Sequence, residues 1–129
     1  MRATSPPPTD RALDVFNADC PSRSALSHAT CRWGALTLAA LTDGPLRFGA
    51  VRRRVDGISE KMLSQTLQEL ERDGLVSRTA YPSIPPRVDY ALTELGRALC
   101  VPVMALGTWV QANLDTIERA RDAFDRAEE

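Results

Sequence analysis

Few residues in this sequence could carry out catalysis or bind a metal, and their spacing excludes most classes of active site. The chain of 129 residues contains three cysteines and a single histidine. One histidine leaves a Ser/His/Asp or Cys/His catalytic set unsupported. Cys20, His28 and Cys31 match no compact zinc motif and lack an evident fourth ligand. No Gly-rich phosphate-binding motif is present. We therefore expect a protein that is not an enzyme and that has no cofactor and no metal.

Cys20 is the cysteine whose position favours a reactive thiol. It precedes Pro21 at the expected start of a helix, where the positive end of the helix dipole lowers the pKa of a thiol, and Arg23 is near in sequence. An inert, half-buried thiol is the alternative. Cys31 is a weaker candidate for reactivity, and Cys100 is expected to lie in the core. The odd number and wide spacing of the cysteines are not those of a disulfide framework.

A different group of functional side chains lies on a helix predicted over residues 59–72. Leu63, Leu67 and Leu70 form its buried stripe, and Ser59 is a suitable N-cap. Glutamine can pair bidentately with adenine, while serine and lysine can reach phosphates or base edges. From periodicity alone, an ordinary solvated helix surface explains this pattern equally well. The polar residues that avoid the stripe and share one side are Ser59, Lys61, Ser64, Gln65 and Gln68.

The helices that must position these side chains follow from apolar spacing and turn residues. Residues 1–19 include a triple proline, show no sustained apolar period and are interpreted as a flexible arm. A first helix starts near Pro21. Further helices are predicted over residues 33–41 and 48–55, and a glycine turn separates the latter from the 59–72 helix. Arg52–Arg54 lie mostly outside the apolar face, so one or two of them at most are expected to touch phosphate.

Two strand-like segments follow, at residues 75–80 and 87–93. In the second segment, apolar residues alternate with more polar ones. The intervening "YPSIPP" cannot be helical and has too few amide donors for a central strand. We interpret it as the tip of a hairpin.

A long helix is predicted from Thr93 onwards. Pro102 is expected to kink it near its first turns, and the polar, acidic tail beyond Arg119 is expected to fray. The apolar residues of this helix approximate a 4-3 repeat, which is typical of a helix that pairs with another. The repeat consists of Leu99, Val103, Leu106, Val110, Ile117 and Phe124, with Asn113 and Ala120 at the intervening positions.

Helix–turn–helix followed directly by a hairpin is the winged helix arrangement, so the predicted fold is mainly α with a small β-hairpin and a long C-terminal dimerisation helix. Its predicted parts are the arm at 1–19, a DNA-binding domain at 20–93, and a dimerisation helix with an acidic tail at 94–129. The hairpin is expected to bring Arg78 and Arg87 near a rigid tip that contacts phosphate or a narrow minor groove. The candidate DNA contacts are Arg47, Arg53, Ser59, Lys61, Ser64, Gln65, Gln68, Arg78 and Arg87.

The distribution of charge suits an anionic partner, although the net charge is −1. Residues 20–97 carry eleven Lys/Arg against eight Asp/Glu, whereas residues 98–129 carry three against six. This small asymmetry gives the body of the protein a mildly basic character. Because no run of 18 apolar residues occurs and the N-terminus lacks a signal-peptide core, we expect a cytoplasmic protein without a membrane span.

The sequence resembles the HxlR-type transcriptional regulators, a winged helix-turn-helix family related to MarR. The resemblance covers roughly residues 20–110 and depends on "CPSR" at 20–23, Trp33 and the segment 41–99. That segment contains "RF" before the first helix of the pair, "ISEKMLSQTLQELERDGLV" and "YPSIPPRVDYALTELG". The chain departs from the family at Thr30–Trp33, where a Gly-Gly-Lys-Trp-like sequence is usual.

The resemblance implies a homodimer, held by the terminal helix and the N-terminal helical region, that binds a pseudo-palindromic double-stranded DNA operator. In several family members a cysteine at the position of Cys20 senses oxidants or electrophiles. The expected function is therefore a sequence-specific DNA-binding regulator, a repressor that responds to oxidants or electrophiles through Cys20. Two alternatives stay open: a winged-helix module that binds a protein, and a regulator controlled by a small-molecule effector rather than by a thiol.

Overall fold

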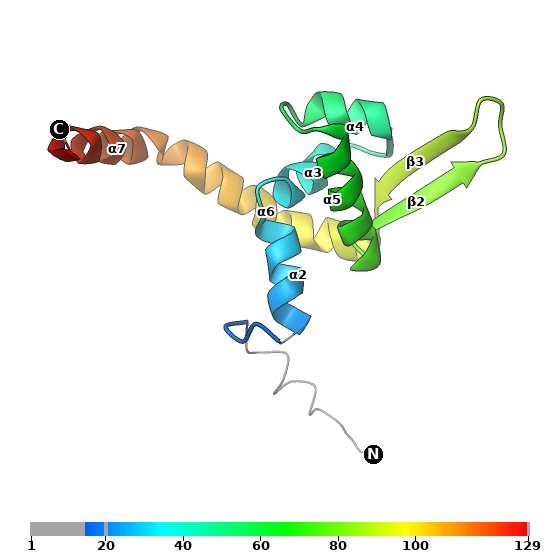
Figure 1. Cartoon of the computed structure of the whole chain (residues 1–129), viewed down its shortest axis with the longest axis horizontal. Coiled ribbons are helices and arrows are strands. Elements are labelled where there is room, and N and C mark those ends of the chain that lie inside the picture. Colours follow the sequence, from blue (N-terminus) through cyan, green and yellow to red (C-terminus); the bar gives the residue numbers. More distant parts are fainter. Residues whose placement is uncertain (1–14, 20, 129) are drawn as a thin grey trace, which may run out of the picture.

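The computed structural model describes residues 15–19 and 21–128. Cys20 and most of the predicted arm lie outside the described residues. In chain order the elements are α2 (Pro21–Thr30), α3 (Gly34–Ala40), β1 (Leu46–Arg47), α4 (Phe48–Arg54), α5 (Glu60–Arg72), β2 (Val76–Tyr81), β3 (Arg87–Leu92), α6 (Glu94–Ala112) and α7 (Leu114–Glu128). The β2–β3 hairpin and α7 extend from opposite sides of a central group of helices (Figure 1). This arrangement confirms the predicted winged helix-turn-helix.

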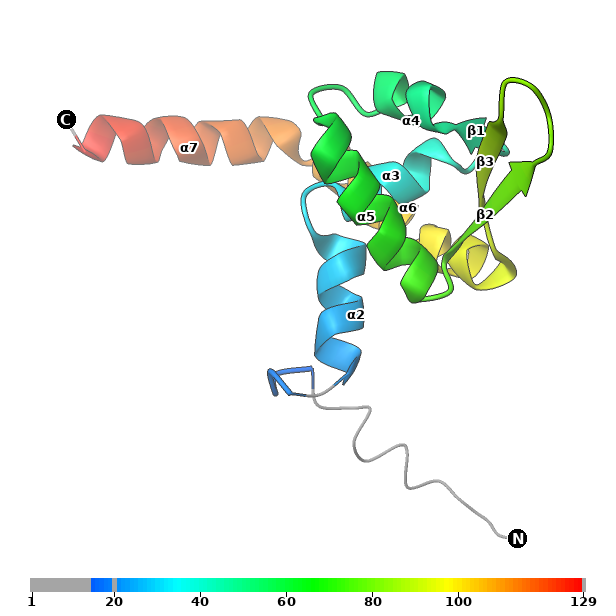
Figure 2. The same ribbon diagram turned by 45° about the vertical axis from the view of Figure 1, so that its right-hand side comes forward.

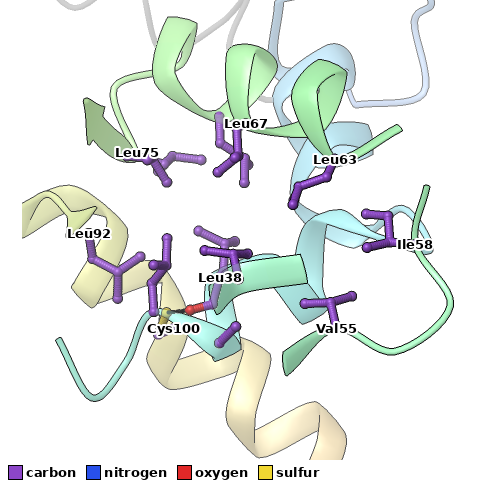
Figure 3. Packing of buried hydrophobic residues seen from close by; sticks show 13 residues of the cluster. Leu38, Val55, Ile58, Leu63, Leu67, Leu75, Leu92 and Cys100 are labelled. Atoms are coloured by element: carbon purple, nitrogen blue, oxygen red, sulfur yellow. Dashed lines mark hydrogen bonds between the residues drawn. The ribbon is translucent and has the colours of Figure 1, made fainter. Parts of the chain in front are cut away.

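The hydrophobic core lies between α3, α4, α5 and the start of α6. The predicted stripe of Leu63, Leu67 and Leu70 is fully buried there. Figure 3 shows these helices contributing to one cluster, with Leu38 of α3 near its centre. Cys100 of α6 is also buried, and its thiol is 3.6 Å from the carbonyl oxygen of Leu38. The expectation that this cysteine belongs to the core is confirmed, and the core fixes α5 relative to α6.

The small sheet has three strands, one more than the predicted hairpin. Its order is β1–β3–β2, and both pairs are antiparallel. β1 consists of Leu46 and Arg47 alone, which lie opposite Tyr90 and Asp89. Two residues cannot show an alternating pattern, so the sequence gives no signal for this strand. Its pairing ties the start of α4 to the base of the wing.

The C-terminal region forms two helices rather than the single long helix that the repeat predicts. The chain leaves α6 at Asn113, whose backbone has φ −112° and ψ 12° and whose side-chain amide donates to the carbonyl of Trp109 at 2.9 Å. The same carbonyl also accepts from the backbone N–H of Asn113 at 3.1 Å, so the asparagine side chain shares the last helical carbonyl with its own backbone. The predicted fraying beyond Arg119 is wrong, because α7 continues to Glu128. An acidic residue four positions before an arginine, as at Asp122 and Arg126, favours this continuation.

α6 has an unusual surface for a helix of one isolated subunit. With 19 residues it is long and apolar enough to cross a bilayer by length and composition alone, although no membrane span was expected. Its first half packs into the protein through Gly96 and Cys100. An added Cβ at Gly96 would overlap the carbonyl oxygen of Leu75, so only glycine allows this close approach. Packing within the subunit therefore explains the apolar residues in the first half of α6. It does not explain the exposed apolar residues in the second half.

Candidate nucleic-acid interface

The turn between α4 and α5 is held by one arginine. The Nε of Arg52 donates to the carbonyl of Ile58 at 3.4 Å, and its Nη1 lies 3.3 Å from a carboxylate oxygen of Glu60. Gly57, with φ +90°, provides the left-handed backbone that the turn requires. Arg52 therefore stabilises the angle between the two helices. Of the predicted triplet, Arg53 and Arg54 are exposed and make no ion pair among the described residues.

The N-terminus of α5 is capped as the sequence predicts. The Ser59 hydroxyl oxygen accepts a hydrogen bond from the backbone N–H of Met62 at 3.1 Å. This bond satisfies one of the free amides of the first turn. It also leaves the hydroxyl hydrogen available, so Ser59 can cap the helix and still donate to a neighbouring group.

The polar side of α5 faces solvent across the helix from the leucine stripe. Because successive residues are about 100° apart on an α-helix, residues three and four apart share a side. Thr66 completes the buried side. Figure 2 shows α5 at the surface of the helical core, and none of the labelled helices and strands lies over it in this view. The predicted contacts Lys61, Ser64, Gln65 and Gln68 are all exposed.

Four further exposed residues of α5 are absent from the predicted set, and two of these, Arg72 and Met62, carry no negative charge. Arg72 lies one helical turn beyond Gln68, at the end of the same side. Met62 lies in the first turn at the edge of this side and is partly exposed. The helical spacing of the sequence is enough to predict Arg72. Met62 could not be predicted in this way, because an apolar side chain near a leucine stripe is expected to be buried in the core.

The wing places its two arginines on opposite faces. In the antiparallel pairing Arg78 lies opposite Tyr90, and Tyr81 lies opposite Arg87. Side chains of directly opposite residues project to the same side of a sheet, and neighbours along a strand alternate. Arg78 thus shares a face with Tyr90, while Arg87 lies on the other face beside the tip. Arg87 therefore lies beside the tip as expected, whereas Arg78 is three residues away from Tyr81 and on the opposite face.

Arg87 is held by two neighbours. Its Nε and Nη2 donate to the two carboxylate oxygens of Asp89 at 3.2 and 3.1 Å. Its guanidinium carbon lies 5.2 Å from the centre of the Tyr81 ring, a cation–π distance. The hydrogen bonds and charge of Asp89 raise the pKa of Arg87 above its ordinary value. The remaining predicted contact, Arg47, is exposed in β1 opposite Asp89.

The predicted dimerisation residues divide into two groups. Leu99 and Val103 are half-buried, and Leu99 packs against the core of its own subunit. Leu106 and Val110 are exposed, and so is Trp109, which lies between them in sequence. Further exposed apolar residues on α6, absent from the prediction, are Leu95, Val101 and Met104.

A groove of about 530 Å³ separates α2 from α6. Leu26 and Leu95 lie on its two walls and are exposed. Nearby, the Nδ1 of His28 lies 2.6 Å from a carboxylate oxygen of Asp73, which joins α2 to the end of α5. The groove is thus an apolar depression between the two elements that the resemblance assigns to the dimer interface.

The departure at Thr30–Trp33 does not strain the backbone. Among the residues that the structure describes, no residue other than glycine has a positive φ. Cys31 is exposed, and its sulfur accepts a hydrogen bond from the N–H of Gly34 at 3.2 Å. The guanidinium of Arg32 lies 4.9 Å from the centre of the Trp33 ring. No group of His, Cys, Asp and Glu that could bind a metal ion occurs within residues 15–19 and 21–128.

Comparison with known proteins decides the family. The sequence pattern of HxlR-like helix-turn-helix proteins matches residues 29–118. The chain belongs to this family. It is 49% identical over 109 residues to the HTH-type transcriptional regulator YtfH of Escherichia coli (strain K12), which covers 84% of this chain and 86% of that protein. The recognition made from sequence motifs is confirmed, and the protein is a helix-turn-helix transcriptional regulator.

Solved structures agree with this assignment. The regulator ytfH from Salmonella typhimurium superimposes with a TM-score of 0.78 at 48% identity, covering 83% of this chain and 96% of that one. The redox regulator HypR in its reduced form gives a TM-score of 0.71 at 36% identity, covering 77% and 98%. YodB from Bacillus subtilis, whose structure was determined after diamide treatment, gives 0.63 at 37% identity, covering 74% and 96%.

Proposed function

We propose that this regulator is a homodimeric repressor that reads a pseudo-palindromic operator with α5. The observation that carries the proposal is the outer side of α5, where exposed Lys61, Gln65 and Gln68 lie opposite a fully buried leucine stripe. A helix of this width fits the major groove, and glutamine can pair bidentately with adenine. Gln65, near the middle of this side, is the residue we assign to base reading.

Phosphate contacts would come from the arginines around α5. Arg53 and Arg54 end α4, Arg47 precedes it, and Arg78 and Arg87 belong to the wing. Each neutralised phosphate contributes about 0.9 to the slope of log affinity against log salt concentration. The affinity of the protein for DNA should therefore fall as salt increases. Residues 20–93 form the DNA-binding part in this proposal.

The dimer would form through residues 94–129 and α2. None of the residues of α7 is buried, although Ile117 and Phe124 give it an apolar side. A helix of 15 residues is marginal in water unless this side is covered. A second copy of the chain supplies an apolar surface of the same kind, on α6 and in the groove between α2 and α6. Two α5 helices would then meet successive major grooves about 34 Å apart.

The signal in this proposal is an oxidant or electrophile that reacts with Cys20. Support comes from relatives: HypR is described in reduced and oxidised forms, and YodB in reduced and diamide-treated forms. Control by a small apolar molecule is the alternative, supported by the groove between α2 and α6. A DNA-binding regulator acts in the cytoplasm of a bacterial cell.

The test of DNA reading begins with selection of a duplex from a random pool by the wild-type protein. Gln65→Ala should bind the selected duplex with about 5- to 150-fold less discrimination against a scrambled duplex, the loss expected for one bidentate base contact. Gln111→Ala, which removes an exposed amide on α6 instead, should discriminate as the wild type does. Failure of the wild type to enrich any sequence would favour the protein-interaction module.

The test of the signal uses the selected duplex and diamide. The wild-type protein should release the duplex after diamide treatment, and Cys20→Ser should retain it. Equal release by both proteins would exclude Cys20 as the sensor, and retention by both would favour the small-molecule alternative.

A further inference from the structure

Asp89 is an acidic residue at the surface that we assign to DNA, where a negative charge is unfavourable unless it has another role. Its side chain is only 12% exposed, and it binds Arg87 through both carboxylate oxygens. Asp89 lies in the middle strand of the sheet, opposite Arg47 of β1 and Thr79 of β2. The carboxylate thus belongs to the rigid part of the wing, whereas Arg87 lies beside the tip.

The guanidinium of Arg87 has donors left after it binds Asp89. A guanidinium carries five N–H donors. The contacts through Nε and Nη2 use two of these donors, and the guanidinium carbon lies over the Tyr81 ring. The donors that are left, on Nη1 and Nη2, form the edge that binds a phosphate bidentately. A guanidinium that is already oriented loses less conformational entropy when it binds.

We propose that Asp89 is a positioning residue for DNA binding, which holds the Arg87 guanidinium against Tyr81 with its free edge available to a backbone phosphate. The inference rests on the proposed function, since it assumes that the wing contacts DNA. It assigns a role in DNA binding to an acidic residue, although a negative charge near DNA is unfavourable by itself.

Electrostatics alone and positioning predict opposite effects when the charge of Asp89 is removed. Asp89→Asn subtracts a negative charge near DNA, so a purely electrostatic effect would strengthen binding. If Asp89 positions Arg87, the same substitution frees the arginine side chain and weakens binding. The sign of the change therefore decides between the two explanations.

The experiment measures binding of the full-length protein to the duplex that the wild type selects from a random pool, by fluorescence anisotropy over a series of salt concentrations. Asp89→Asn is expected to bind at least fivefold more weakly, and its salt slope is expected to fall by up to about 0.9 per protomer, one phosphate contact. Asp56→Asn is the matched control, because it removes an exposed carboxylate from the turn before α5. It should bind as tightly as the wild type or more tightly.

Two more variants separate positioning from a general effect on the wing. Arg87→Lys keeps the positive charge but cannot make the bidentate contacts, so it should weaken binding about as much as Asp89→Asn. In the double variant Arg87→Ala/Asp89→Asn, the second substitution should add little to the loss caused by Arg87→Ala, because Asp89 acts through Arg87. Thermal melting of each variant reports whether the fold is retained.

Wild-type affinity or better in both Asp89→Asn and Arg87→Lys would overturn the inference. An unchanged salt slope with an altered preferred sequence would also overturn it, because Arg87 would then read bases in the minor groove. If the wild type selects no duplex, the proposed function itself fails, and this result is distinct from the other two.

Discussion

Trp109 offers the most direct test of the proposed dimer. It projects from α6 and is 58% exposed in the isolated subunit. A tryptophan that becomes buried removes roughly 150–250 Å² from water. If a partner covers only the part that is exposed here, about 90–145 Å² is lost, which corresponds to about 2–4 kcal/mol at about 25 cal/mol per Å².

A two-fold symmetric interface contains this residue twice, so the contribution doubles. Trp109→Ala retains the burial of a methyl group and allows some repacking, which reduces the effect. We therefore expect the dimer dissociation constant to rise on the order of 10²- to 10³-fold, since each 1.4 kcal/mol is about tenfold.

Sedimentation equilibrium over a range of protein concentrations measures this change. Ile84→Ala is the matched control, because Ile84 is completely exposed at the wing tip, away from α6, and should leave the dissociation constant unchanged. DNA binding supplies a second measurement: Trp109→Ala should bind a single half-site as the wild type does and a full operator more weakly. A wild-type protein that is monomeric at about 100 µM, or a Trp109→Ala dimer as tight as wild type, would refute the reasoning.

Two other predictions concern the fold. Ser59→Ala removes the cap of α5 and should lower the free energy of unfolding by about 1 kcal/mol in urea titration, whereas Ser64→Ala, in an exposed position of the same helix, should not lower it. Burial raises the pKa of the Cys100 thiol, so in the native protein iodoacetamide should label exposed Cys31 well before Cys100. Peptide mapping that found equal labelling rates would contradict the second prediction.

The parts of the fold that depend on local sequence could be predicted. The cap at Ser59 and the leucine stripe lie within one segment, and together they define α5. The hairpin tip follows from its prolines, because they cannot donate to a ladder. These features require no knowledge of the rest of the chain.

The parts that depend on contacts between distant segments could not be predicted. β1 exists only because β3 lies beside it, and the pairing of Arg52 with Glu60 depends on the angle between two helices. The placement of the wing arginines is a different case. Arg78 is two residues from buried Val76 and shares its face, so alternation along β2 already contains this information.

The pairing of charges changes how the DNA interface should work. Among the described basic residues near α5 and the wing, Arg52 and Arg87 are paired with carboxylates, and Arg52, whose Nε and Nη1 both bind within the turn, contributes less free charge than a formal count suggests. A formal count of Lys and Arg therefore overestimates the salt dependence of binding. The same ion pairs fix the geometry of the turn and of the wing. They therefore orient the arginine side chains while they reduce the electrostatic attraction of the protein to DNA. As the salt concentration rises, such a regulator would lose affinity for non-specific DNA before it loses affinity for its operator. Only binding to the operator includes base contacts, and these do not depend on free charge.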